Sequence, residues 1–213
     1  MRRLVLTFAL ALVASCSSKK PRDLDHSLIH VTGDARLRTD TVGDGKFAEL
    51  STFVLVEAEN TATEGAYVTL GGELADEADH TVAILRAQSI YVPAGATRTF
   101  ALVDKERKPR PTAKAARIRV RGARLAAMPP PAHVEGLREV PDGDKTVVQG
   151  VVKNDAARGG NIMVIATFYD RENKPMTRPF SLVWVEPNAT QAMQFVGPPG
   201  STRATMFVGD VVY

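Results

Sequence analysis

Residues that commonly do chemistry are scarce in this chain of 213 residues, which has one cysteine and four histidines. One cysteine cannot form a disulfide within the chain or build a cysteine-based zinc site. His26 and His30 lack a nearby third metal ligand. His80 falls in an expected turn, and His133 comes just after three prolines, so we expect both to be surface histidines. The chain has no nucleophile elbow, zinc-protease motif, phosphate loop or dinucleotide fingerprint. We therefore expect a protein that is not an enzyme and that has no metal or cofactor.

The lone cysteine, Cys16, follows a segment with the layout of a secretory signal. Two arginines precede an apolar run over residues 4–13, which is too short to span a bilayer permanently. The sequence Val13-Ala14-Ser15-Cys16 resembles the lipobox of bacterial lipoproteins. That resemblance implies cleavage after residue 15 and acylation of Cys16, with chains such as palmitate. The alternative is an ordinary signal peptide followed by an incidental cysteine.

Residues 16–27 are expected to hold the lipidated cysteine and a flexible tether, because they are polar and lack periodicity. Two or more acyl chains give stable anchoring, so a membrane is the first expected partner. Ser17 follows the cysteine where an aspartate would signal retention at the inner membrane. By resemblance to known sorting preferences, the expected location is the cell envelope, at the outer rather than the inner membrane.

Turn residues and apolar residues recur at one constant offset along the chain. This tandem repeat predicts two related domains, over residues 28–124 and 132–213, joined by a proline-rich linker at 125–131. Phe100 and Phe195 are one position out of step, which we assign to a gap in the turn after the proline. The matched pairs are Asn60 and Asn154, Gly65 and Gly159, Asp76 and Asp170, Ile90 and Trp184, and Pro93 and Pro187.

Both copies show the pattern of short β-strands. Apolar residues alternate over 162–169, with turn signals on either side, and no long helical period occurs outside the signal. We therefore predict an all-β chain of two tandem antiparallel β-sandwiches of immunoglobulin-like form. The expected strands are 47–59, 66–74, 81–91, 97–102, 115–121, 147–153, 162–169, 179–185, 190–196 and 202–212.

The second copy carries a recognisable motif in Gly150-Val151-Val152-Lys153-Asn154 and Ala166-Thr167-Phe168-Tyr169-Asp170, followed by Pro187 and Phe195. It resembles the FxLYD domain of bacterial surface and secreted proteins. Ala166 and Phe168 depart from that pattern, and the first copy matches less well, with Ala75 in place of Tyr169. The resemblance implies a seven-stranded immunoglobulin-like sandwich without catalysis.

Charge is segregated within the first copy. Residues 47–85 contain no lysine or arginine, whereas residues 105–124 contain only one acid, Glu106. Arg117, Arg119 and Arg121 alternate with apolar residues and so form a row on one face of an expected strand; we call them the arginine row. We predict that Glu57 and Glu59 pair with the arginine row across neighbouring strands. The alternative is that the basic segment binds an anionic glycan, lipid or acidic protein. The candidate anion-binding residues are Lys105, Arg107, Lys108, Arg110, Arg117, Arg119 and Arg121.

Nucleic acid is not an expected partner, because residues 101–124 contain no tyrosine or phenylalanine on which bases could stack. The leading functional hypothesis is a lipid-anchored, non-catalytic envelope protein that presents two β-sandwich modules for protein–protein interaction or scaffolding, with strand addition as one mode of contact. The alternative is a module that binds an anionic glycan or lipid through residues 105–124.

Overall fold

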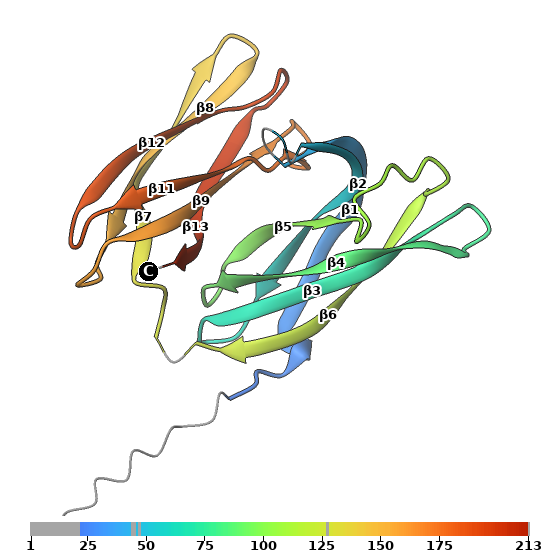
Figure 1. The fold of residues 1–213 in the computed structure, drawn as a ribbon, viewed down its shortest axis with the longest axis horizontal. Coiled ribbons are helices and arrows are strands. Elements are labelled where there is room, and N and C mark those ends of the chain that lie inside the picture. The colour runs from blue at the N-terminus through green and yellow to red at the C-terminus, as the bar shows by residue number, and fades with distance from the viewer. Residues whose placement is uncertain (1–21, 44–45, 47, 127, 213) are drawn as a thin grey trace, which may run out of the picture.

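The computed structural model describes residues 22–43, 46, 48–126 and 128–212. The expected signal segment and Cys16 lie outside these residues. Apart from one short 3₁₀ turn, η1 (His26–Leu28), the elements are β-strands in antiparallel pairs. The prediction of an all-β fold is therefore confirmed, and the described chain forms several antiparallel sheets (Figure 1).

The first half, residues 22–126, contains two three-stranded sheets that face each other across an apolar core. Phe100 and Leu102 enter this core from one sheet, and Leu70, Leu74 and Ile90 enter it from the other. One sheet has the order β1-β2-β5, with β1 (Ile29–Val42), β2 (Glu49–Asn60) and β5 (Thr97–Val103). The other has the order β4-β3-β6, with β4 (Thr81–Val92), β3 (Ala66–Ala75) and β6 (Ala115–Leu125).

The second half, residues 128–212, repeats this arrangement around a core that includes Phe168, Ile162 and Val148. One sheet has the order β12-β8-β7, with β12 (Thr190–Val196), β8 (Lys145–Asn154) and β7 (Ala132–Asp142). In the other, the central strand β9 pairs with the remaining strands. These are β9 (Gly160–Tyr169), β10 (Pro175–Thr177), β11 (Phe180–Val185) and β13 (Arg203–Val212).

Matching hydrogen bonds show that the two halves use the same turns. The Asn60 amide donates to the carbonyls of Glu64 and Val92 and accepts from the Ala62 N–H. Asn154 makes the corresponding bonds: its amide donates to the carbonyls of Arg158 and Val185 and accepts from the Ala156 N–H. Both asparagines therefore hold the ends of strands together, as asparagines that follow strands commonly do.

The two aspartates at the shared offset also correspond. Asp76 Oδ1 accepts from the N–H groups of Ala78 and His80, and Asp170 Oδ1 accepts from those of Glu172 and Lys174. Hydrogen bonding to the backbone lowers the pKa of both carboxyls. Each turn then reverses through a residue with positive φ, Asp79 at 64° and Asn173 at 60°.

Three expected alignments are wrong. In the turn, the Ala96 N–H donates to the Pro93 carbonyl and the Ala189 N–H donates to the Glu186 carbonyl, so Pro93 corresponds to Glu186 rather than to Pro187. The register pairs Tyr91 with Tyr67 and Trp184 with Asn161, so Trp184 corresponds to Tyr91 rather than to Ile90. Phe100 pairs with Val56 and Met193 with Gly150, so Phe100 corresponds to Met193 rather than to Phe195.

The reason for these three mismatches is a difference in segment length. The segment from Asp170 to Trp184 is one residue shorter than the segment from Asp76 to Tyr91. Trp184 therefore lies on the outer face of its sheet, whereas alignment with Ile90 would have placed it in the core.

The sequence missed the first strand of each half, β1 and β7. Each strand contains a glycine with positive φ, Gly33 at 71° and Gly136 at 61°, next to a shift in register. Such a bulge interrupts the two-residue alternation that predicts a strand. With these strands, the first half has six strands, and the second half, which carries the FxLYD resemblance, has seven, one of them the three-residue β10.

The expected tether is shorter than predicted at its C-terminal end. Leu24 donates its N–H to the Ala123 carbonyl, and Leu125 donates to the Arg22 carbonyl. Asp23 also forms a β-bridge with Arg124. Residues 22–25 therefore belong to the first half and lie along the end of β6.

Candidate interaction surfaces

The two halves contact each other through the outer face of sheet β1-β2-β5 and the outer face of β9 and β13. Ile165 and Phe207 of the second half are 2% and 5% exposed, and both pack into the first half's core cluster. Leu55 points away from its own core and is nonetheless fully buried. This burial shows that the expected linker joins two halves in contact.

Tyr169 is the centre of the polar contacts between the halves. Its hydroxyl donates to Glu57 Oε1 at 2.8 Å and lies 3.0 Å from Thr99 Oγ1, while the Arg203 guanidinium covers its ring. Burial is the main cause that raises the pKa of Tyr169. Tyr169, the aromatic residue at the end of β9, therefore serves as a contact to the other half.

Arginines complete the contact between the halves. Arg36 donates to Asp170 Oδ2 at 2.9 Å and to the Pro175 carbonyl, and Arg38 donates to the Met176 carbonyl. Burial lowers the pKa of Arg178 to about 10. The hydrogen bonds of Arg36 and Arg38 hold the turn after β9 against β1.

An apolar ridge continues from this contact to the open edge of the same sheet. Phe180, Leu182 and Trp184 of β11 are 53%, 59% and 54% exposed. They alternate with Ser181 and Val183, so all three project from the outer face. We call these three residues the β11 ridge.

The β11 ridge has two properties of a binding strand. β11 pairs with β9 on one side, and no strand among the described residues pairs with its other side. Residues 179–185 contain no charged side chain, although charges are a common protection of exposed sheet edges. Trp184 is also held in place, because its indole N–H donates to Glu186 Oε1 at 2.9 Å and its ring covers Gly159.

A basic face occupies the corresponding position on the first half. Arg119 and Arg121 project from the outer face of β6 in alternation with Ile118 and Val120, and Arg124 and Arg86 are exposed on the same side of the sheet. The strand between them contributes a glycine, Gly71, against which the Arg121 stem lies. We call Arg86, Arg119, Arg121 and Arg124 the basic face.

The predicted pairing of Glu57 and Glu59 with the arginine row is wrong. The two glutamates are on β2, and the arginines are on β6 in the other sheet. Arg117 instead bonds Glu73 and Asp79, each at 2.7 Å. The alternation of side chains along each strand correctly predicted which residues share a face. It could not predict which strands are neighbours, because that depends on the strand order in the sheets.

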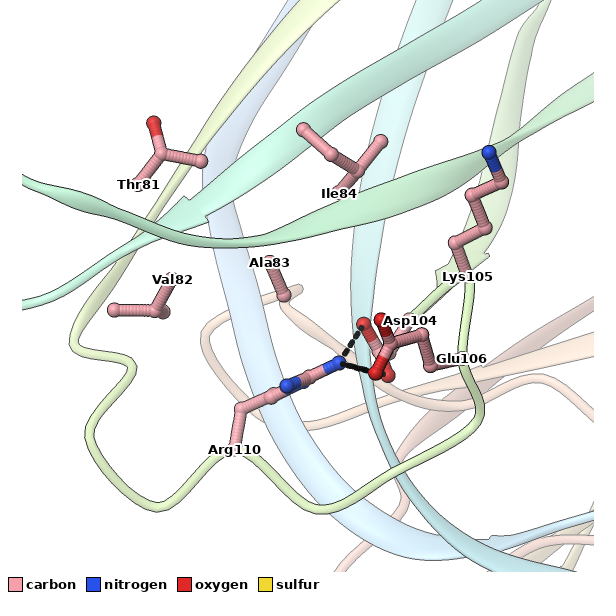
Figure 2. A pocket seen from close by; sticks show the side chains of 8 residues that line it. All are labelled: Thr81, Val82, Ala83, Ile84, Asp104, Lys105, Glu106 and Arg110. Atoms are coloured by element: carbon pink, nitrogen blue, oxygen red, sulfur yellow. Dashed lines mark hydrogen bonds and ion pairs between the residues drawn. The ribbon is translucent and has the colours of Figure 1, made fainter.

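The basic segment between β5 and β6, residues 105–114, is neutralised only in part, because two of its five basic residues, Lys108 and Arg110, pair with Asp104 and Glu106. Figure 2 shows Arg110 beside these two acids. Arg110 bonds Asp104 at 3.1 Å and Glu106 at 2.8 Å, and Lys108 lies 3.2 Å from Glu106. Hydrogen bonds from Arg110 and Lys108 lower the pKa of Glu106. The structure thus divides the seven candidates between this loop and the β6 row.

A shallow pocket beside this loop is lined by Thr81, Ile84 and the Arg110 cluster. Within the described residues, His, Cys, Asp and Glu do not gather in a group able to bind a metal ion. No helix of the described part of the chain has the length and apolarity to cross a membrane. No family model matches the chain, and no curated protein matches it.

Proposed function

We propose that this protein is a non-catalytic, lipid-anchored envelope protein whose two immunoglobulin-like, FxLYD-like modules present a binding surface for another protein. The observation that carries the proposal is the β11 ridge. Three large apolar side chains are exposed side by side on an open sheet edge, next to a face that already binds another sheet. A partner strand added along β11 would satisfy its free backbone groups and cover these side chains.

The energetics favour such a contact. Fully burying one large apolar side chain contributes roughly 1.5–3 kcal/mol, and tryptophan is among the residues most enriched in binding hot spots. Trp184 is already oriented by Glu186, so little side-chain freedom is lost on binding. The ridge therefore supplies both affinity and a preferred orientation for the partner.

Site-specific photocrosslinking tests the protein contact. A photoreactive phenylalanine analogue at position 182 should give a crosslinked species in cells, while the same analogue at position 89 should not. Ser89 is the matched control, because it has the same place on the first half as Leu182 has on the second. Phe180→Ser with Trp184→Ser should abolish the crosslink from position 182. Equal crosslinking from both positions contradicts the assignment to β11.

The proposed anchor rests on the lipobox-like sequence that ends at Cys16. It is tested separately by labelling cells with an alkyne-tagged palmitate. The wild-type protein should take up the label, and Cys16→Ser should not. Label in both proteins, or in neither, contradicts lipidation at this residue.

A second candidate function is the binding of an anionic ligand by the first half. The observation that favours it is the basic face, whose arginines are exposed and lie on one side of one sheet. Arg119 and Arg121 have no acidic partner within 4.0 Å among the described residues, unlike Arg117 and Arg110. The same holds for Lys105 and Arg107 within the described part of the chain, but they lie on the segment between β5 and β6, whereas the basic face gathers its arginines on one side of one sheet. We therefore place the anion site on the basic face.

A further inference from the structure

We infer that the basic face binds the surface of an anionic lipid bilayer. The inference deepens the second candidate function, on which it rests, and names the ligand class. Four residues carry it, Arg86, Arg119, Arg121 and Arg124, and all are exposed. Their charge is complementary to the phosphate groups of anionic lipids, which attract basic side chains near the membrane surface.

The shape of the face fits an extended surface. Gly71, Thr69, Ala87 and Ser89 form its centre, and these small residues leave no pocket walls. Arginines two positions apart on a strand project about 6.8 Å apart. A face of this kind offers separate contacts to several lipid phosphates, whereas a small anion would need convergent donors around one point.

The acids near the basic face lie at its ends. They are Glu73, Asp79 and Asp23, and also Asp210 of the second half, which adds to the effect of burial in raising the pKa of Tyr67. Glu73 and Asp79 both bond Arg117, so their charge is already compensated. Asp23 lies 3.9 Å from Arg124, with both side chains well exposed to water. Interactions between exposed charges at that separation are weak, so Arg124 keeps most of its attraction for phosphate.

Two tyrosines border the same face. Tyr67 and Tyr91 pack with ring centroids 5.5 Å apart, and Tyr67 is 39% exposed. Amphipathic aromatic rings are typical of the level of the lipid headgroups. This end of the face therefore combines aromatic rings with Arg124, which pairs with Tyr67 in the register of β3 and β6.

The N-terminal side of the chain meets the fold at this same end. Arg22 lies beside Leu125, and it also bonds Glu64 at 2.8 Å. Only residues 17–21 separate Arg22 from Cys16, a stretch that extends about 20 Å at most. Acylation of Cys16 would hold the tyrosine end of the basic face within reach of the bilayer.

Vesicle flotation of the full chain tests the inference. We compare vesicles of phosphatidylcholine alone with vesicles that also contain phosphatidylglycerol, at low and at high salt. The difference between the two vesicle types is the measurement, because any apolar insertion by residues 4–13 or by an acyl chain contributes to both. We expect binding that depends on phosphatidylglycerol and weakens with salt.

Variants assign this binding to the basic face. R119Q/R121Q/R124Q should lower the partition coefficient for the anionic vesicles about 100-fold at low salt, or roughly five-fold for each arginine. R119K/R121K/R124K should retain most of the binding. K105Q/R107Q/K108Q removes the same charge from the hairpin and is the matched control, which should also retain it. Equal losses in the two glutamine variants would overturn the assignment, and unchanged thermal melting checks that each variant is folded.

Binding to alginate, a soluble acidic polysaccharide, separates two claims: that the basic face binds anions, and that its ligand is an anionic bilayer. Arginine-dependent binding to alginate without binding to anionic vesicles would overturn the bilayer inference and would support anion binding by this face. Binding to neither probe would overturn both. Arginine-dependent binding to anionic vesicles that is at least as tight as binding to alginate of the same charge supports the inference.

Discussion

The outer faces of sheets β4-β3-β6 and β11-β9-β13 hold corresponding places in the two halves, yet their chemistry differs. At equivalent positions of the register, Ser89 corresponds to Leu182, Arg119 to Phe207 and Arg124 to Val212. The first face is basic, and the second is apolar and partly covered by the other half. The inward-facing residues must fill a core in both halves, whereas the outward-facing residues are free to diverge.

The position of Tyr169 shows the same divergence most sharply. The register places Ala75 opposite Ala115 on the first half and Tyr169 opposite Arg203 on the second. Ala75 supports only its own sheet, while Tyr169 reaches Glu57 and Thr99 of the other half. The change from Ala75 to Tyr169 is therefore one of the differences, together with Arg119 to Phe207, that separate the face that stays open from the face that packs on the other half.

The largest effect on stability is expected from a substitution in the part of the apolar face that the first half covers. Tyr169 is 2% exposed, so Tyr169→Ala should lower the free energy of unfolding by about 3–5 kcal/mol. Tyr169→Phe is the matched control, which keeps the ring and should cost about 1 kcal/mol, because Glu57 Oε1 loses one hydrogen bond but still accepts from Thr99 Oγ1. Denaturant titration followed by the fluorescence of Trp184 measures both. A loss below about 1 kcal/mol for Tyr169→Ala would mean that this contact does not stabilise the second half.

A smaller effect on stability is expected at acid pH, where the equivalent turns at Asp76 and Asp170 can be compared. The pKa of each carboxyl, Asp76 and Asp170, is lowered in the folded state by backbone hydrogen bonds, and Arg36 adds to the effect at Asp170. A carboxyl with a lowered pKa stabilises the fold above its ordinary pKa, and this contribution is lost as the pH falls through the folded value. Unfolding should therefore become easier from about pH 5 down to about pH 2.

Variants of these two aspartates sharpen the comparison. Asp170→Asn should flatten the acid limb of the stability curve more than Asp76→Asn, because only Asp170 also bonds an arginine of the other half. Melting temperatures measured across this pH range report the difference. Identical pH profiles for the two variants would show that the ion pair between the halves adds nothing to the turn.

The smallest effect is expected on β6, where Arg117 lies next to the basic face. Arg117→Gln should lower Tm by about 1–2 °C, because it removes exposed ion pairs to Glu73 and Asp79. Arg119→Gln is the matched control on the same strand and should leave Tm unchanged. Differential scanning calorimetry at low and at high salt tests this pair. Equal losses for both variants would contradict the distinction between a paired arginine and a binding arginine.

The sequence by itself determined the β class and the positions of the turns that begin at Asn60, Asp76, Asn154 and Asp170. Alternating apolar residues over 162–169 and the recurring Asn and Asp residues are local signals, because a strand's two faces and a turn's hydrogen bonds involve neighbours along the chain. The same local signals failed at β1 and β7, where glycine bulges break the alternation. They also failed at Trp184, where a one-residue difference reverses which face the side chain occupies.

Only the tertiary structure decided which surfaces meet. Glu57 and Arg117 have the right parity for a cross-strand pair, but the sheet order sends Glu57 to Tyr169 and Arg117 to Glu73. The β11 ridge was hidden for the same reason, since its three residues have the composition of a core strand. Their exposure follows from the position of β11 at the edge of a sheet, and strand order is set by contacts between residues distant in sequence.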